Sequence, residues 1–287
     1  MPNSLDTEAI KASAERPGPI GVFDSGYGGL TILRSLRKAL PDADFIYLGD
    51  NGRAPYGTRS FELVYSFTLE AVRYLFARGC HLVILACNTA SAKALRSIQQ
   101  RDLPQIDPNR RVLGVIRPTA EAVGNITRSG AVALVGTPGT VASGSYDMEL
   151  AKLFPDVKLY SHACPMWVPL VENMESEGDG ADYFVRRDLE AVLSQSPDID
   201  TLILGCTHYP LLLNKIRKYA PEGLTILPQG DIVAASLTDY LKRHPEIDRM
   251  ITRGGSVDYI TTESPEKFST LAAVFMGDTV NARHDTL

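Results

Sequence analysis

Short apolar runs alternate with segments of helical periodicity along most of the chain. The run IGVF at 20–23 is apolar on both faces, which is typical of a strand buried in a parallel sheet. The segment 30–40 repeats its leucines every three or four residues, which predicts an amphipathic helix. The predicted strands are 20–23, 45–48, 82–86, 112–116, 131–135, 157–160, 201–204 and 225–227. The predicted helices are 30–40, 61–78, 89–100, 141–154, 182–193, 211–219 and 232–241.

This order predicts an α/β protein, because strands separated by helices form parallel sheets through βαβ units. The pattern restarts after residue 116, and each half has one cysteine at the end of a buried strand. We therefore expect two pseudo-symmetric α/β domains with mainly parallel sheets and the active site in the cleft between them. The first domain is expected to comprise 18–115 with 230–287, and the second 116–229.

The two ends of the chain carry weaker signals. Residues 1–17 are polar and are expected to form a disordered extension. The segment after Asp248 shows little periodicity, and no element is predicted within it.

Composition and charge narrow the class of protein. The chain has 287 residues, 44% of them hydrophobic and 22% charged, which is ordinary for a globular enzyme with a large core. Its net charge of −5 comes without a basic tract, so no nucleic-acid partner is expected. The apolar runs are too short to cross a bilayer, and residues 1–19 lack the hydrophobic stretch of a signal peptide. We expect no membrane partner and a cytoplasmic location.

The cysteines and histidines give no sign of a disulfide or a metal. The four cysteines form no CxxC pair, and a reducing compartment would keep them available for chemistry. No pair among the histidines at 81, 162, 244 and 284 has metal-ligand spacing. No metal site is predicted.

Two cysteines stand out by position. Cys87 in ACNTAS (86–91) and Cys206 in GCTHYP (205–210) each follow a buried strand and precede a helix-like segment. Open α/β sheets bind ligands at such strand ends, and a helix start activates a thiol. Two thiols presented this way predict a pair of acid/base groups facing one substrate, with His208 placed to tune Cys206. Cys80 and Cys164 lack this context and are interpreted as buried structural residues.

Three further motifs add candidate residues. DSGYGG at 24–29 follows the first strand, and its glycines let the backbone approach a carboxylate or phosphate, or simply make a tight turn with Asp24 as cap. It matches neither the dinucleotide nor the ATP fingerprint. The tripeptide 55–57 (PYG) lies in a loop and by itself indicates a turn. Glu172 ends an apolar run bounded by prolines, and by composition it is either partly buried or an ordinary surface acid.

Taken together and in this order, the motifs resemble those of glutamate racemases, in the aspartate/glutamate racemase superfamily. The resemblance extends from about residue 20 to about residue 241 and rests on 24–29, 55–57, 87–91, 165–172 and 205–210. Two positions depart from the family pattern: Tyr27 replaces a small aliphatic residue, and Arg117 replaces a common glutamate.

The resemblance implies cofactor-independent interconversion of L- and D-glutamate, which supplies D-glutamate for peptidoglycan synthesis. One thiolate removes the α-proton from one face, and the opposing thiol protonates the other face. By resemblance, Cys87 handles the proton of the D-isomer with help from Asp24. Cys206 handles that of the L-isomer with help from His208 and Glu172.

The resemblance also implies which residues hold the substrate. They are Asp24, Ser25, Tyr56, Gly57, Asn88, Thr89, Thr207 and His208. We expect glutamate as the substrate, a homodimer, and no cofactor or metal.

Three other functions stay open at this point. An aspartate racemase has the same two-domain fold, but it typically carries Glu where this chain has His208, and it lacks the Ser91 pattern. A cysteine-dependent hydrolase or amidotransferase needs one Cys with a His base, and gives the second Cys no role. A non-catalytic anion-binding module would use only the glycine-rich turn.

Overall fold

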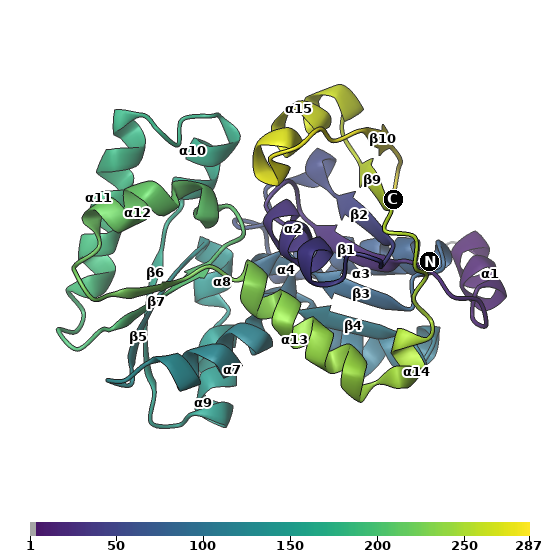
Figure 1. Cartoon of the computed structure of the whole chain (residues 1–287), viewed down its shortest axis with the longest axis horizontal. Coiled ribbons are helices and arrows are strands. Elements are labelled where there is room, and N and C mark those ends of the chain that lie inside the picture. Colours follow the sequence, from purple (N-terminus) through teal and green to yellow (C-terminus); the bar gives the residue numbers. More distant parts are fainter. Residues whose placement is uncertain (1–3) are drawn as a thin grey trace.

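The protein is described by a computed structural model over residues 4–287 and has two lobes, each built around one parallel sheet (Figure 1). The first sheet has the strand order β10-β9-β2-β1-β3-β4. Its strands are β1 (Ile20–Asp24), β2 (Phe45–Gly49), β3 (Leu82–Leu85), β4 (Arg111–Gly114), β9 (Val257–Thr261) and β10 (Ala282–His284). Because all of its strand pairs are parallel, the carboxyl ends of β1 and β3 meet at one edge.

The second sheet has the order β6-β5-β7-β8, and its strand pairs are also parallel. Its strands are β5 (Ala131–Gly136), β6 (Lys158–Ala163), β7 (Thr201–Gly205) and β8 (Thr225–Leu227). The central strands β1, β5 and β7 are buried along their whole length, as expected for strands covered on both faces. The α/β class with mainly parallel sheets is confirmed.

Helices cover both sheets (Figure 1). In the first lobe they are α1 (Ser4–Ala12), α2 (Leu30–Ala39), α3 (Phe61–Ala77), α4 (Asn88–Lys93), α5 (Leu95–Ser97), α6 (Leu103–Ile106), α13 (Gly230–Arg243), α14 (Pro245–Asp248) and α15 (Pro265–Met276). In the second they are α7 (Ile116–Ile126), α8 (Pro138–Ala142), α9 (Ser145–Leu153), α10 (Trp167–Glu172), α11 (Asp179–Leu193) and α12 (Leu213–Tyr219). None of the helices within residues 4–287 combines the length and the apolar character that a bilayer crossing requires.

Several helices differ from the sequence prediction, among them α10, which was not predicted. The helix α7 was not predicted, because Pro118 and Gly124 lie within it; a proline in the first turn is compatible with a helix. The helix predicted at 141–154 is broken into α8 and α9 at Gly144, whose φ of 62° is left-handed. The helix predicted at 89–100 ends as α4 at Lys93, and short helical turns follow.

The tail after Asp248 was also left without elements, yet it completes the first sheet. The strand β9 pairs with β2, and β10 pairs with β9. Its helix α15 packs against α2 and β10. No local pattern revealed these strands because their neighbours come from distant parts of the chain.

The expected disordered extension over residues 1–17 is wrong for the described residues 4–17. Helix α1 packs against α3, and Ile10 is buried. The buried guanidinium of Arg110 holds this segment: Nη2 donates to the Ile10 carbonyl and to Ser13 Oγ, both at 2.8 Å. The same side chain pairs with Asp107 at 3.2 Å. A distant partner orders this segment, which explains why local composition misled the prediction.

We predict that Arg110→Met destabilises the fold. The change leaves the buried Cys80 carbonyl without its donor, and a buried unpaired group costs about 1–3 kcal/mol. The carbonyls of Ile10 and Phe76 each lose one of their donors as well. Urea unfolding is expected to show a loss of roughly 1–3 kcal/mol. The neighbouring change Arg111→Met is the control and is expected to have little effect, since its side chain bonds only carbonyls near the surface. Equal losses in both variants would contradict this account of the N-terminal segment.

Candidate active site

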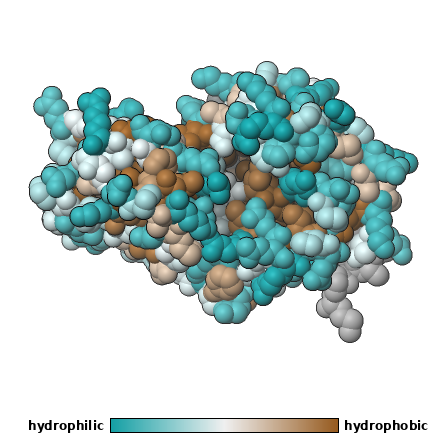
Figure 2. All heavy atoms as spheres, turned by 90° about the horizontal axis from the view of Figure 1, so that it is seen from below, coloured by the Kyte–Doolittle hydropathy of each residue, from teal (hydrophilic) through white to brown (hydrophobic). Residues whose placement is uncertain are grey.

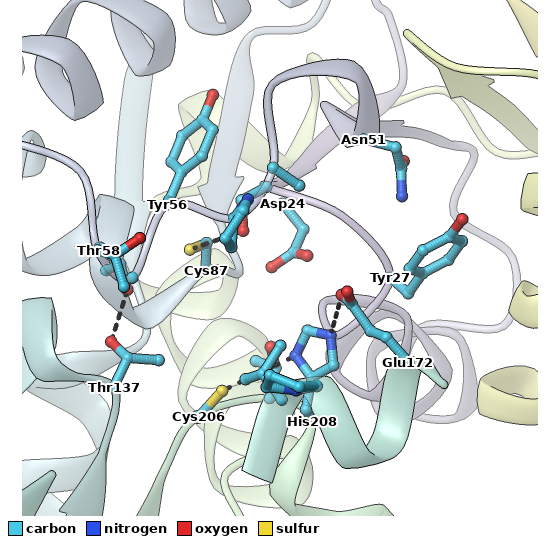
Figure 3. A pocket seen from close by; sticks show the side chains of 18 of the residues that line it. Asp24, Tyr27, Asn51, Tyr56, Thr58, Cys87, Thr137, Glu172, Cys206 and His208 are labelled. Carbon is cyan, nitrogen blue, oxygen red and sulfur yellow. Dashed lines mark hydrogen bonds and ion pairs between the residues drawn. The ribbon is translucent and has the colours of Figure 1, made fainter. Parts of the chain in front are cut away.

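A cavity of about 840 Å³ lies between the two lobes, and both contribute to its wall. The first lobe supplies residues that follow β1, β2 and β3, and the second supplies residues that follow β5, β6 and β7. Figure 3 shows the sulfur atoms of Cys87 and Cys206 on opposite sides of this space. The structure therefore brings together the two thiols that are 119 positions apart in the sequence (206 minus 87).

Cys87 lies just beyond β3 and caps the N-terminus of α4. Its Sγ accepts a hydrogen bond from the Ala90 amide at 3.4 Å and lies 3.4 Å from Ser25 Oγ. Burial, and then the negative charge of Asp24, raise the pKa of the Cys87 thiol to about 12, although its bonds to Ser25 and Ala90 oppose the shift. A thiol with so high a pKa is protonated at neutral pH and can act as an acid.

Asp24 ends β1 and is buried. Its Oδ2 accepts the Gly26 amide at 2.9 Å, while its Oδ1 is buried and has no hydrogen-bond partner among the described residues. Burial raises the pKa of the Asp24 carboxyl, even though the nearby His208 charge works against the shift. A buried carboxyl oxygen without a partner, on the wall of a cavity, is placed to bind a cation or to exchange a proton with a ligand.

Cys206 directly follows β7 and faces a histidine–glutamate pair. Its Sγ lies 3.8 Å from His208 Nδ1, and His208 Nε2 lies 2.9 Å from Glu172 Oε1 (Figure 3). Glu172 is the last residue of α10, so two separate elements hold the imidazole from both sides. Such a chain fixes the ring orientation and couples the charge on the carboxylate to the thiol.

The charge state of His208 follows from these contacts. Burial lowers the pKa of its imidazole, but the bonds to Cys206 and Glu172 outweigh burial and raise the pKa to about 10. At neutral pH the ring therefore carries a proton. A cation beside a cysteine is the setting in which thiolates act as bases or nucleophiles. The two halves of the site are consequently unlike: Cys87 faces a carboxyl, and Cys206 faces an imidazolium.

The glycine-rich turn brings the two halves into contact. A Cβ added to Gly28 would lie 2.3 Å from Thr207 Oγ1 and 2.4 Å from His208 Nδ1, which no side chain can accommodate. The Thr31 hydroxyl lies within hydrogen-bond distance of the Thr207 carbonyl, at 3.0 Å. Glycine at position 28 thus lets the first lobe pack directly on the Cys206 motif.

Most of the predicted substrate-binding residues line the cavity, but two of their side chains are engaged elsewhere. Ser25, Gly57, Thr89 and Thr207 are in the wall. Tyr56 also contributes to the wall, but its hydroxyl donates to Asp50 at 2.5 Å and points away from the cavity (Figure 3).

Asn88 is the second such residue. It accepts from the Tyr146 hydroxyl at 2.8 Å and donates to Gln229 at 2.5 Å, so its amide group belongs to a buried polar network.

The two departures from the family pattern lie in different places. Tyr27 lines the cavity and stacks on Phe268 of α15, with ring centroids 5.2 Å apart. Arg117 lies outside this cavity. It pairs with Glu121 on α7 and lines a second cavity of about 900 Å³ between the lobes. Figure 2 views the molecule from below, the side of α7 and α13, where a partly apolar hollow separates the lobes.

Sequence reasoning missed several lining residues. Thr137 follows β5 and Cys164 follows β6, so their positions at strand ends carried a signal that was not used. Asn51 follows β2 in the same way. Lys267 of α15 had no such signal, because the tail gave no predicted element.

The comparisons with known proteins agree with this geometry. The family model of Asp/Glu/Hydantoin racemase matches residues 27–237. A glutamate racemase of Ruegeria sp. (strain TM1040) is 42% identical over 269 residues, covering 90% of this chain and 96% of the relative. A crystal structure of a glutamate racemase isoform from Bacillus anthracis superposes with a TM-score of 0.85 at 35% identity, covering 94% of this chain and 98% of that one.

A second solved structure includes a ligand in its description. It is a glutamate racemase from Francisella tularensis in complex with D-glutamate, with a TM-score of 0.81 and 29% identity, covering 94% of this chain and 97% of that one. The family match covers well over half of the chain, and the relatives match over nearly their whole length. The chain therefore belongs to the glutamate racemases of the Asp/Glu/Hydantoin racemase family.

Proposed function

We propose that the protein interconverts L- and D-glutamate by proton transfer between Cys87, the substrate and Cys206. The observation that carries the proposal is the placement of two thiols on opposite sides of one cavity, with a carboxyl beside one and an imidazolium beside the other. A planar carbanion formed between them is protonated from the face opposite to the one that lost its proton. That order of events inverts the α-carbon.

The two faces have different partners. Cys206 as thiolate removes the proton of L-glutamate while His208, held by Glu172, keeps a positive charge beside it. Cys87 then donates its thiol proton and yields D-glutamate. In the reverse direction Cys87 is the base, and Asp24 is the group close enough to bind the ammonium or exchange a proton.

Groups from both lobes hold the substrate in this proposal. Ser25, Thr89 and Thr207 offer hydroxyls, and the start of α4 offers backbone amides to a carboxylate. Gly57 accepts the Gly139 amide at 2.8 Å, which keeps the wall continuous between the lobes. Tyr56 and Asn88 act by positioning this wall, because their polar groups already have partners.

The cellular setting follows from the activity. D-Glutamate made by a racemase of this family is used in peptidoglycan synthesis, and we place the protein in the cytoplasm, where thiols stay reduced. We also propose a homodimer. We also propose two domains, the first comprising 18–115 with 230–287 and the second 116–229. The membership of the two sheets supports this division.

We predict that Cys87→Ala and Cys206→Ala each abolish racemisation while the fold stays intact. Each thiol is needed in every turnover, once as base and once as acid. Circular dichroism during turnover of each enantiomer of glutamate and of aspartate gives the rates. A cysteine hydrolase would need only one of the two thiols, and an aspartate racemase would prefer aspartate. Near-native turnover in either variant would overturn the two-thiol mechanism, and Cys80→Ala is the matched control.

We predict that His208→Asn and Asp24→Asn slow racemisation in opposite directions, the first from L-glutamate and the second from D-glutamate. Acid/base assistance is worth roughly 10²- to 10⁴-fold, so kcat from L-glutamate should fall more in the first variant, and kcat from D-glutamate in the second. The enantiomers have equal free energy, so kcat/KM must fall equally in both directions for any one variant. The asymmetry is therefore sought in kcat, and in the isotope effect of α-deuterated substrate from each side. Equal losses of kcat and equal isotope effects from L- and D-glutamate, in both variants, would contradict the roles assigned to His208 and Asp24.

We predict that Glu172→Gln lowers the pKa of His208 from about 10 toward its usual value, because it removes one of the interactions that hold the ring charged. The raised pKa stabilises the folded state fully below the unfolded value of about 6.5, and this contribution is lost as pH rises through 10. NMR titration of the His208 ring measures the shift. The wild-type unfolding free energy should decline more between pH 6.5 and 10 than that of the variant. An unchanged His208 pKa would contradict the coupling.

A further inference from the structure

Three side chains with metal-ligating atoms meet at the edge of the cavity, whose wall includes Cys164, and none of them is one of the two thiols used above. His162 lies on β6, Cys164 follows β6, and Asp188 lies on α11, which packs against β6 in the same lobe (Figure 1). One ligand atom from each lies within 4.8 Å of the others. No metal-ligand spacing is visible along the chain, because α11 brings Asp188 to the strand from 24 positions beyond Cys164 (188 minus 164).

The distances suit a tetrahedral ion. His162 Nε2 lies 3.4 Å from Asp188 Oδ1. Two nitrogen or oxygen ligands at zinc bond lengths, on a tetrahedron, are about 3.3 Å apart. One ligand atom of each of the three residues lies within 4.8 Å of the others, so one ion is within reach of all three, with the fourth position left for water.

The carboxylate of Asp188 supplies the independent observation. Its Oδ1 is taken by Arg187, at 2.8 Å from Nε and 2.7 Å from Nη2. Its Oδ2 is buried and has no hydrogen-bond partner among the described residues, although the residue is 0% exposed. A buried carboxylate oxygen left unpaired costs free energy, which a bound cation would recover.

The Cys164 thiol beside this carboxylate is also in an environment that a cation would stabilise. Burial, followed by the negative charge of Asp188, raises the pKa of the Cys164 thiol well above its usual range. A divalent ion replaces the thiol proton, which leaves to solvent, and it adds positive charge beside the Cys164 thiolate and the Asp188 carboxylate, whose charge Arg187 already neutralises in part. His162 is 29% exposed at its side chain and marks the route by which an ion would enter.

We propose that His162, Cys164 and Asp188 form a binding site for a divalent transition metal of the zinc class. A thiolate, an imidazole and a carboxylate together select zinc or cobalt over magnesium or calcium, which prefer all-oxygen ligands. The site ties α11 to the turn that leads into α10, the helix whose last residue is Glu172. It is separate from the proposed proton-transfer groups, so its test does not depend on the activity.

The test uses Co²⁺ as the probe and the full-length Cys87→Ala/Cys206→Ala protein, which retains only the thiols of Cys80 and Cys164. One equivalent of Co²⁺ is expected to give a thiolate-to-cobalt charge-transfer band and the strong visible bands of four-coordinate cobalt, and Zn²⁺ should remove them. Adding Cys164→Ala should abolish the charge-transfer band. Adding Cys80→Ala, the matched control for a second buried thiol, should leave it unchanged.

Further variants keep the test decisive if Cys164→Ala fails to fold. Asp188→Asn retains shape but loses charge, and His162→Gln changes a partly exposed side chain. Each should weaken Co²⁺ binding at least about 10-fold, with the far-UV spectrum unchanged. No charge-transfer band in the parent protein, its persistence without Cys164, or its loss without Cys80 would each overturn the proposal.

Discussion

The contact between the glycine-rich turn and the Cys206 motif is the constraint on which the site depends. Two thiols can share one substrate only if the sheets that carry them hold a fixed distance, and here that distance is set by backbone packing at Gly28 against Thr207 and His208. The Thr31 hydroxyl supports the same contact through the Thr207 carbonyl. On the other side, Asn88 reaches Gln229 and Tyr146, so the Cys87 motif is also tied to groups beyond its own sheet. Buried polar bonds of this kind fix geometry because breaking one leaves its partners unsatisfied.

Within that frame, charge distinguishes two thiols that sit alike at strand ends. Burial, and then the nearby carboxyl of Asp24, raise the pKa of the Cys87 thiol and favour its protonated form. Cys206 lies near an imidazole held by Glu172, which favours a positive charge at that face. A two-base enzyme needs one protonated and one deprotonated group at the start of each turnover. In a site with two identical halves, nothing in the protein would favour this difference in protonation. In the proposed mechanism, the asymmetry of Asp24 against His208 supplies this difference before the substrate arrives.

Sequence reasoning recovered the features that follow from local pattern. The apolar runs before Cys87 and Cys206 predicted buried strands, and the structure confirms both, one in each of the two sheets. The cavity between the lobes brings the ends of these two strands together. Features created by distant partners were not recoverable. Tyr56 was expected to bind the substrate, but its hydroxyl donates a hydrogen bond to Asp50. The N-terminal segment looked disordered, but Arg110, about a hundred residues away, holds it. Strand β9 depends on pairing with the distant β2, and β10 depends in turn on pairing with β9, so no short window of the sequence predicts them.

Cys164 shows how far position alone determines reactivity. Like Cys206 it directly follows a parallel strand and lines the same cavity. Its charged neighbour is the carboxylate of Asp188 rather than an imidazolium, and burial, followed by that negative charge, raises the pKa of its thiol. A negative neighbour makes a thiol a poor base at neutral pH, whereas the same pair of groups becomes favourable once a divalent ion lies between them. Three cysteines at equivalent strand ends thus take different chemistry from the one charged group that each faces, and the fold determines which group that is.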